Sequence, residues 1–186
     1  LLKLFKKDMA IMLSALFSKI IEIGHVPTPW KHSRTVFIYK KDDPNQAKNW
    51  RPIGITSCIY RIFTCAITHA ILTADDNRGL LDDTQKGFLP GREGCLEHAC
   101  TLNELVQNAK RTGSEIYLTA LDFTNAFGSV PHKLIFEQMA IKGVPPKIIR
   151  VIENVYHENK TVLEFGADQS EPVNWRKGVI QGCPLS

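Results

Sequence analysis

The segment from residue 116 to residue 132 constrains this chain most strongly. It reads Ile-Tyr-Leu-Thr-Ala-Leu-Asp-Phe-Thr-Asn-Ala-Phe-Gly-Ser-Val-Pro-His. Its first six residues form an apolar run typical of a buried strand. The run ends at Asp122, and a helix start follows, with Ser129 as a candidate cap and Pro131 at a first helical position. The pattern predicts a lone carboxylate at the carboxyl end of a strand, a place that suits ligand binding.

Asp122 also has an ordinary interpretation as a turn or cap acid, because Asp favours such positions. Its neighbourhood favours a functional role. Phe127 stands five residues further on, in a polar stretch of small residues that offers its ring no obvious core. The final residues, 178–186, form a second loop punctuated by glycines.

Composition sets broad limits on fold and partners. A chain of 186 residues with 44% hydrophobic content can bury one ordinary core. Residues 1–41 carry eight Lys and Arg against two Asp and Glu, whereas the remainder has a balance of −2. This basic part is compatible with a polyanion such as nucleic acid, although a solvated helix face explains it equally well.

The five cysteines indicate no disulfide framework and no zinc ribbon, because their number is odd and no Cys-x-x-Cys occurs. Cys95, His98 and Cys100 are close in sequence but lack a fourth ligand and a suitable spacing for zinc. Reduced thiols in an intracellular compartment are the simpler interpretation. The longest uncharged run near the start, residues 9–18, is too short to span a bilayer, so no membrane partner is expected.

Apolar spacing and turn residues predict an α+β fold that is rich in helices and has short, mostly antiparallel strands. An amphipathic helix should begin near Phe5 and stop at Gly24. Further helices are expected over residues 58–73, 96–111, 132–142 and 145–158. A strand is expected at 35–39, an extended loop at 49–57, and a hairpin of 160–165 with 172–175.

Four short motifs follow one another along the chain. They are Arg51-Pro-Ile-Gly-Ile-Thr, Gln85-x-Gly-Phe-x-Pro-Gly-Arg, Leu121-Asp-Phe-x-x-Ala-Phe and Gly178-Val-x-Gln-Gly-x-Pro-Leu-Ser. Each is weak alone, but their order and spacing over residues 25–186 resemble a non-LTR (LINE-type) retrotransposon reverse transcriptase. Group II intron reverse transcriptases share much of the pattern. Residues 94–99, Gly-Cys-Leu-Glu-His-Ala, look most like the site-specific R2-type branch.

The resemblance implies the right-hand polymerase fold. It assigns residues 1–112 and 141–178 to the fingers, and 113–140 and 179–186 to part of the palm. The family's Tyr/Phe-Ala-Asp-Asp loop, with the other two catalytic aspartates, and its thumb are expected beyond Ser186. The 186-residue chain is therefore expected to be an amino-terminal fragment that is inactive alone.

The implied activity is RNA-directed DNA polymerisation, in which two Mg²⁺ ions assist attack of a primer 3′-hydroxyl on a deoxynucleoside triphosphate. By similarity, Asp122 is the first catalytic aspartate and a metal ligand, and the backbone carbonyl of Phe123 also holds metal. The implied nucleotide-binding residues are Lys40, Arg51, Phe127, Gln181 and Gly182. The implied template-binding residues are Gln85, Phe88, Gly91 and Arg92.

Each nucleotide-binding residue has an implied task. Arg51, helped by Lys40, grips the triphosphate, and the Phe127 ring lies under the sugar, where it blocks a 2′-hydroxyl. Gln181 and Gly182 lie beside the nascent base pair. The implied partners are an RNA template, a DNA primer and deoxynucleoside triphosphates, with no small-molecule cofactor. The full-length element protein is expected to be intracellular and to work in the nucleus.

Gly128 departs from the family pattern, which usually has Asp at this position. This departure keeps open a domesticated module that binds RNA without catalysis. Another class, a haloacid-dehalogenase-like phosphatase, also places Asp after an apolar strand. That chemistry needs a second Asp two residues later, where this chain has Thr124.

Overall fold

The structure is a computed structural model that describes residues 6–75, 81–89, 91 and 94–186. It divides into two compact units, which are described separately. The larger unit comprises residues 1–74 and 125–186, and the smaller comprises residues 75–124. Runs of helices and runs of short, mostly antiparallel strands follow one another along the chain, which confirms the expected α+β class.

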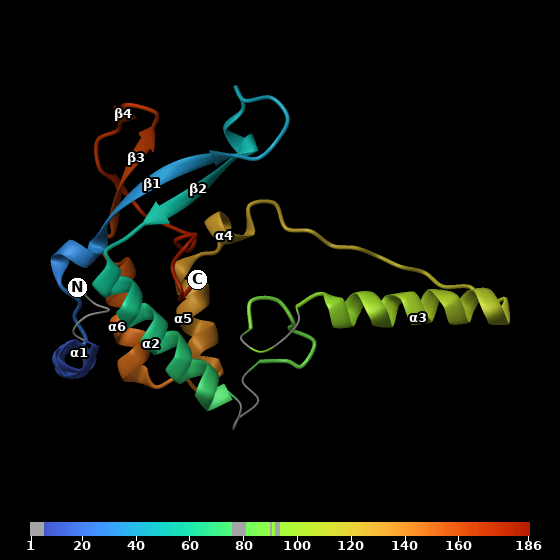
Figure 1. The fold of residues 1–186 in the computed structure, drawn as a ribbon, viewed down its shortest axis with the longest axis horizontal. Helices are drawn as coiled ribbons and strands as arrows, with labels where there is room; N and C mark the ends of the chain where they lie inside the picture. The colour runs from blue at the N-terminus through green and yellow to red at the C-terminus, as the bar shows by residue number, and fades with distance from the viewer. Residues whose placement is uncertain (1–5, 76–80, 90, 92–93) are drawn as a thin grey trace. The chain divides into compact units, whose positions relative to one another are not determined.

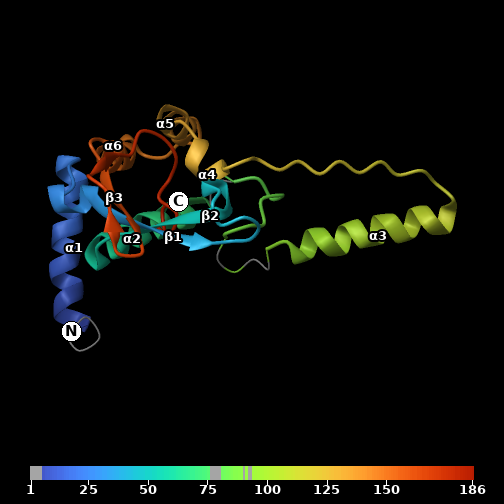
Figure 2. The same cartoon turned by 90° about the horizontal axis from the view of Figure 1, so that it is seen from above.

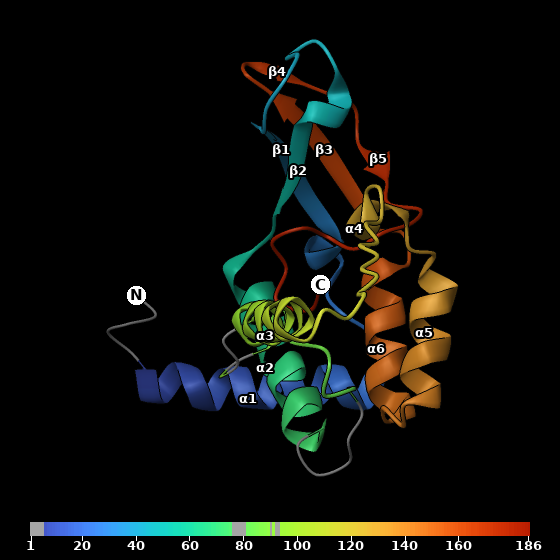
Figure 3. The ribbon, with the colours of Figure 1, turned by 90° about the vertical axis from the view of Figure 1, so that its right-hand side faces the viewer.

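The larger unit holds most of the helices. These are α1 (Lys6–Ile23), α2 (Cys58–Asp75), which ends at the unit boundary, α4 (Ala126–Ser129), α5 (His132–Ile141) and α6 (Pro146–Tyr156). Two 3₁₀ turns, η1 (Thr28–Lys31) and η2 (Ala47–Asn49), precede strands. Helices α5 and α6 lie side by side, and α1 runs steeply across the strand direction (Figure 2, Figure 3).

One five-stranded sheet completes this unit. Its strands are β1 (His32–Tyr39), β2 (Trp50–Ile55), β3 (Lys160–Phe165), β4 (Asp168–Gln169) and β5 (Val173–Asn174). The order is β2-β1-β3-β4 (Figure 1), and β5 also pairs with β3 (Figure 3). The β1–β3 pair is parallel and the other three pairs are antiparallel, as the sequence predicts for most of the strands.

The core of the larger unit joins α1, η1, α2 and α6, and aromatic rings link the first three of these elements. The Trp30 ring contacts those of Phe17, Tyr60 and Phe63, with centroids 5.4–6.4 Å apart. Tyr60 and Phe63 are fully or almost fully buried. Because burying a large apolar side chain contributes ~1.5–3 kcal/mol, this cluster fixes the helices that support the sheet.

Strand β2 corrects one prediction. Residues 49–57 were expected to be an extended loop, and they include Pro52 and Gly54, two residue types that are unusual within strands. In the structure, residues 50–55 pair antiparallel with β1, and Ile38 lies opposite Arg51. Proline is tolerated because β2 is the outermost strand of the sheet and its other edge needs no continuous ladder.

The smaller unit shows that the strand predicted at residues 116–121 is wrong. Helix α3 (Leu96–Thr112) ends at Gly113, which has φ 68° and forms a left-handed cap. The chain then continues without strand pairing (Figure 1). Tyr117 is 86% exposed and Leu121 87%. A strand requires a hydrogen-bonded neighbour as well as a β-prone sequence, and none of the described residues pairs with this run.

The helix start after Asp122 also differs from the prediction. Ser129 is the last residue of α4, and its hydroxyl donates to the carbonyl of Ala126 at 3.3 Å. Helix α5 begins at His132, and Pro131 occupies the N-cap with φ −65° and ψ 133°. Proline thus lies one position earlier than expected, because the short α4 turn uses the residues that could have capped a longer helix.

Candidate nucleotide site

The β1–β2 hairpin carries two of the predicted nucleotide-binding cations. Arg51 is exposed on β2 opposite Ile38, and the amide of Lys40 donates to the carbonyl of Asn49 at 2.9 Å. Residues two apart on a strand share a face, and so do directly opposed residues. The register therefore places Lys40 and Arg51 on the same face of the hairpin, at the end nearest its loop.

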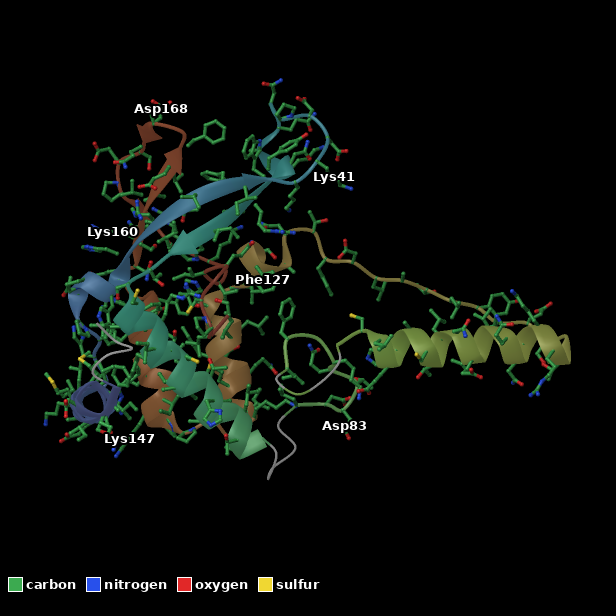
Figure 4. All side chains as sticks on the ribbon, in the orientation of Figure 1. Lys41, Asp83, Phe127, Lys147, Lys160 and Asp168 are labelled. Atoms are coloured by element: carbon green, nitrogen blue, oxygen red, sulfur yellow. The ribbon has the colours of Figure 1, made fainter. Side chains whose placement is uncertain are left out.

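The hairpin loop between Lys40 and Arg51 is held by Asp43. Its carboxylate accepts hydrogen bonds from the Asn45 amide at 3.0 Å and from Gln46 at 3.2 Å. These bonds, the Asn45 amide first, lower the pKa of the Asp43 carboxyl. Asp43 therefore acts as a turn former, and Figure 4 shows Lys41 at this end of the larger unit.

The segment after residue 177 packs against β2. The Gly54 amide donates to the Gln181 carbonyl at 2.8 Å, and a Cβ at Gly182 would lie 3.6 Å from the Ile53 side chain. Arg51 and Ile53 are two residues apart on β2, so they share the face that Gly182 approaches. This contact brings Gly182 near the face that carries Arg51, and the bond to Gly54 places Gln181 beside the same strand.

The same segment is joined to the turn that carries Phe127. The Val179 amide donates to the Phe127 carbonyl at 2.7 Å, and the Gly178 amide donates to the Val130 carbonyl at 2.8 Å. Phe127 is 38% exposed, and Figure 4 shows it at α4. Only Ile180 lies between Val179 and Gln181, so backbone hydrogen bonds connect the Phe127 turn to β2 through one short segment.

Gly178 is required for this arrangement. It has φ +81°, a conformation that side chains other than glycine rarely adopt. A Cβ there would lie 2.7 Å from both the Gly128 Cα and the Phe127 carbonyl oxygen. The Phe127 turn and residues 178–179 therefore pack backbone against backbone.

Helix α2 supports the segment from its buried side. Tyr60 on α2 is fully buried, and its hydroxyl lies 3.5 Å from the Cys183 sulfur. Burial, and then the neighbouring Cys183 thiol, raise the pKa of the Tyr60 phenol. Thr68 donates to the Pro184 carbonyl at 3.1 Å, and Ser186 donates to the Ile180 carbonyl at 2.7 Å. Residues 180–186 are thus held by two side chains of α2 and by a hydrogen bond within the segment.

The remaining predicted site residues belong to the smaller unit. Asp122 and Phe123 are exposed, and Asp122 makes no hydrogen bond or ion pair with any described residue. Gln85 donates from its side chain to the Gly87 carbonyl at 3.0 Å. Phe88 is 92% exposed with φ 63°, and Gly91 has φ 73° with open space around it. Arg92 lies outside the described residues.

Comparison with known proteins identifies the family. The family described as "Reverse transcriptase (RNA-dependent DNA polymerase)" matches residues 38–186. The chain belongs to the reverse transcriptase family. It is 30% identical, over 174 residues, to the "Retrovirus-related Pol polyprotein from type-1 retrotransposable element R2" of Nasonia vitripennis, covering 94% of this chain and 16% of that protein.

Other relatives support the non-LTR, R2-like placement of this reverse transcriptase domain. The "type-2 retrotransposable element R2DM" polyprotein of Drosophila melanogaster is 29% identical over 92% of the chain and 16% of the relative. The "RNA-directed DNA polymerase from mobile element jockey" of the same species is 23% identical over 96% of the chain and 19% of the relative. The chain thus spans less than a fifth of the length of these curated relatives.

Sequence reasoning missed several residues that hold this candidate site together. They contact residues 178–183 or the Phe127 turn, and none had been assigned a role: Gly54, Tyr60, His132, Trp175 and Gly178. Gly54 and Gly178 lie inside the quoted motifs, so their positions in those motifs could have marked them as candidate site residues. The aromatic residues and His132 gave no pattern that distinguishes them from ordinary core or helix-end residues.

Gly128, the departure from the family pattern, now has a structural account. A Cβ there would lie 2.6–2.9 Å from atoms of the Asn125 side chain. The backbone of Asn125 has φ 51°. Asn125 would have to move if residue 128 carried a side chain. The consequence of Gly128 is therefore one of local packing against Asn125.

Within the described residues, no three His, Cys, Asp or Glu side chains lie close enough to share a metal ion. The exposed Asp122 carboxylate has the chemistry of a single oxygen ligand for a divalent cation. Among the residues that the structure describes, no helix has the length and apolar character needed to cross a bilayer.

Proposed function

We propose that this domain works in an RNA-directed DNA polymerase of an R2-like non-LTR retrotransposon, which adds deoxynucleotides to a primer 3′-hydroxyl on an RNA template. The observation that carries the proposal is the connection of Arg51, Gln181 and Phe127. Strand β2 and the Phe127 turn are both hydrogen-bonded to residues 178–181. Groups suited to phosphate, base and sugar are thereby gathered on one scaffold.

Each group has a distinct chemical task in this proposal. The guanidinium of Arg51 and the ammonium of Lys40 attract the triphosphate, and Arg can bind two phosphate oxygens at once. The Phe127 ring excludes a 2′-hydroxyl by occupying its space. Gln181 and Gly182 form a wall beside the nascent base pair, held in place by the Gly54 amide. All of these residues bind or orient the nucleotide and transfer no proton.

We assign Asp122 and the Phe123 carbonyl to the catalytic metal site. When bound, two Mg²⁺ ions would activate the primer hydroxyl and offset charge on the transferred phosphate. Asp122 supplies one negative oxygen ligand of the kind that Mg²⁺ prefers. Because one carboxylate cannot hold two cations, further acidic ligands must complete the site, and we propose that the 186-residue chain alone does not polymerise.

The charge distribution supports nucleic acid as the partner. The larger unit carries eighteen Lys and Arg against ten Asp and Glu, a net charge of +8, whereas the smaller carries five against nine, a net charge of −4. A basic surface attracts the phosphates of template and primer. Residues 85–92 are assigned to the template because Phe88 presents an exposed ring on which a base can stack. We place the full-length element protein in the nucleus.

Primer extension tests the proposal. A full-length protein that contains this domain is incubated with an RNA template, a DNA primer, deoxynucleotides and Mg²⁺, alongside the 186-residue chain. The full-length protein should extend the primer and the shorter chain should not. A full-length protein that binds RNA without extending any primer would instead support the domesticated RNA-binding module. Extension by the 186-residue chain would overturn the proposed dependence on further ligands.

A further inference from the structure

His132 is linked to the Phe127 turn through the backbone of residues 178–179. It is the first residue of α5, and its Nε2 lies 2.8 Å from the carbonyl oxygen of Gly178. A carbonyl oxygen can only accept, so Nε2 carries the proton and donates. The imidazole packs against Tyr156 of α6, with ring centroids 4.5 Å apart. Tyr156 is buried, so the imidazole rests on a fixed surface.

The Gly178 carbonyl also accepts from Trp175, whose Nε1 lies 3.2 Å away. The bond from His132 is the shorter of the two. Two side chains from different parts of the larger unit therefore hold one peptide group. A buried carbonyl that loses its better donor is costly, and the local backbone moves to recover a partner.

The consequence of such a movement is specific because of what Gly178 contacts. Its own amide is bound to Val130, and the next amide, that of Val179, is bound to the carbonyl of Phe127. No side chain lies between the two backbone segments, since a Cβ at Gly178 would lie 2.7 Å from the Gly128 Cα. A shift at Gly178 is therefore transmitted directly to the turn that carries the Phe127 ring.

We infer that His132 is a positioning residue for sugar discrimination: its Nε2–H fixes the Gly178 carbonyl and thereby the place of the Phe127 ring. This inference rests on the proposed function, because it concerns the nucleotide that the Phe127 ring meets. His132 touches no part of that nucleotide itself. It acts through the backbone of residues 178–179.

Two substitutions separate the hydrogen bond from the packing. His132→Phe keeps a ring against Tyr156 and removes the donor, whereas His132→Gln keeps an N–H donor and removes the ring. His157→Gln is the matched control, because His157 is exposed and its imidazole lies 3.9 Å from the exposed Glu158 carboxylate. Each variant is made in the full-length protein, and a melting curve confirms that it is folded.

The measured quantity is the ratio of kcat/KM for a deoxynucleotide to that for the matching ribonucleotide. His132→Phe should lower this ratio by about fivefold or more, the effect expected for one lost hydrogen bond. His132→Gln should retain most of the ratio, and His157→Gln should leave it unchanged. Amide hydrogen exchange at Gly178 and Val179 should be faster in His132→Phe than in His132→Gln.

Three results would overturn the inference while the proposed function stands. The first is an unchanged ratio in a folded, active His132→Phe protein. The second is an equal loss of activity toward both nucleotides, which indicates a structural role alone. The third is unchanged exchange at Gly178 and Val179, which removes the physical link. A wild-type protein without any primer extension would instead refute the proposed function.

Discussion

The Gly54 amide and the Gln181 carbonyl form a 2.8 Å hydrogen bond that ties the outermost strand of the sheet to the segment after residue 177. The close approach is possible because residue 54 has no side chain. A Cβ there would lie 2.3 Å from Cγ2 of Ile180, which is almost completely buried. Strand and segment are therefore fitted to each other at this glycine.

We expect Gly54→Ala to lower the free energy of unfolding by ~1–3 kcal/mol, the usual cost of overpacking a well-packed site. Urea denaturation of the 186-residue chain measures the change. Gly87→Ala is the control, because the nearest contact of its Cβ would be the Gln85 side chain at 3.7 Å. Equal stability of the Gly54→Ala variant and the wild type would show that the segment can move away without cost.

Tyr60 should make stability fall at alkaline pH. Burial and the Cys183 thiol raise the phenol's pKa above its unfolded value near 10, so the folded state keeps the proton. This contribution is fully present below about pH 10 and is lost as pH rises further, because only the unfolded phenol ionises readily. Free energies of unfolding at pH 8 and pH 11 should therefore differ less in Tyr60→Phe than in the wild type.

Tyr156 provides a check on that experiment. Burial, and then the Cys183 thiol, also raise the pKa of this phenol, so a part of the alkaline dependence should persist in Tyr60→Phe. Removing both phenols should remove more of it than removing either one. If the free energy of unfolding depends on pH equally in the wild type and in Tyr60→Phe, the Tyr60 phenol ionises equally easily in the folded and the unfolded protein.

The sequence predicts the helices well, because helix formation depends on the local pattern of apolar and capping residues. The apolar spacing of residues 58–73 and the glycine at 113 identify α2 and the end of α3 within a residue or two. The run at 116–121 has equally strong strand propensity, yet it forms no strand, because pairing depends on a partner elsewhere in the chain. Strand β2 is the opposite case, since β1 pairs with a segment that contains Pro52 and Gly54.

The candidate site was predictable in its chemistry more than in its construction. Arg51, Phe127 and Gln181 could be selected by motif, because charge and aromatic character are visible in a sequence. The hydrogen bonds that join them run from amides to carbonyls, and every residue has these groups. Only the fold shows that Gly178 packs directly against the backbone of the Phe127 turn and that Gly54 leaves room for the Ile180 side chain.

RNA binding by the chain should depend strongly on salt. If it neutralises five phosphates of a single strand, log affinity should fall with log salt at a slope of roughly −3.5. Lys41→Ala should reduce the slope by roughly 0.7 if this exposed lysine meets one phosphate. Lys19→Ala is a matched control, because Lys19 already pairs with Glu22 at 3.0 Å. Affinity that is constant between low and physiological salt would exclude a phosphate-driven interaction.

In the full-length protein, Asp122→Asn should abolish primer extension and leave template binding nearly intact. Asn keeps the shape of the side chain but removes the charge that offsets a divalent cation. Glu115→Gln is the control, because Glu115 is an exposed acid of the same extended segment, with Tyr117 as its hydrogen-bond partner at 2.7 Å. A mutant that retains more than about a tenth of the wild-type rate would have an activation free energy raised by less than ~1.4 kcal/mol. That result would exclude Asp122 as a metal ligand.

Phe127→Val should allow ribonucleotides into the site. The Phe127 turn is fixed by the Val179 amide, so the ring has a defined place from which it can exclude a 2′-hydroxyl. Single-nucleotide extension on one template gives kcat/KM for each sugar. The ratio of deoxy to ribo values should fall by at least ~10-fold, or about 1.4 kcal/mol. Phe165→Val is the control, because Phe165 belongs to an aromatic cluster with Phe37 and Trp50.

The alternative for Phe127 is an ordinary packing role, and a melting curve separates the two. Large-to-small substitution of a core aromatic residue costs ~3–5 kcal/mol, and activity would then fall for both nucleotides together. Phe127 is 38% exposed, so its truncation should cost less than this full amount. A well-folded Phe127→Val protein with an unchanged ratio would remove Phe127 from the nucleotide site, because the turn would then hold a ring that no sugar meets.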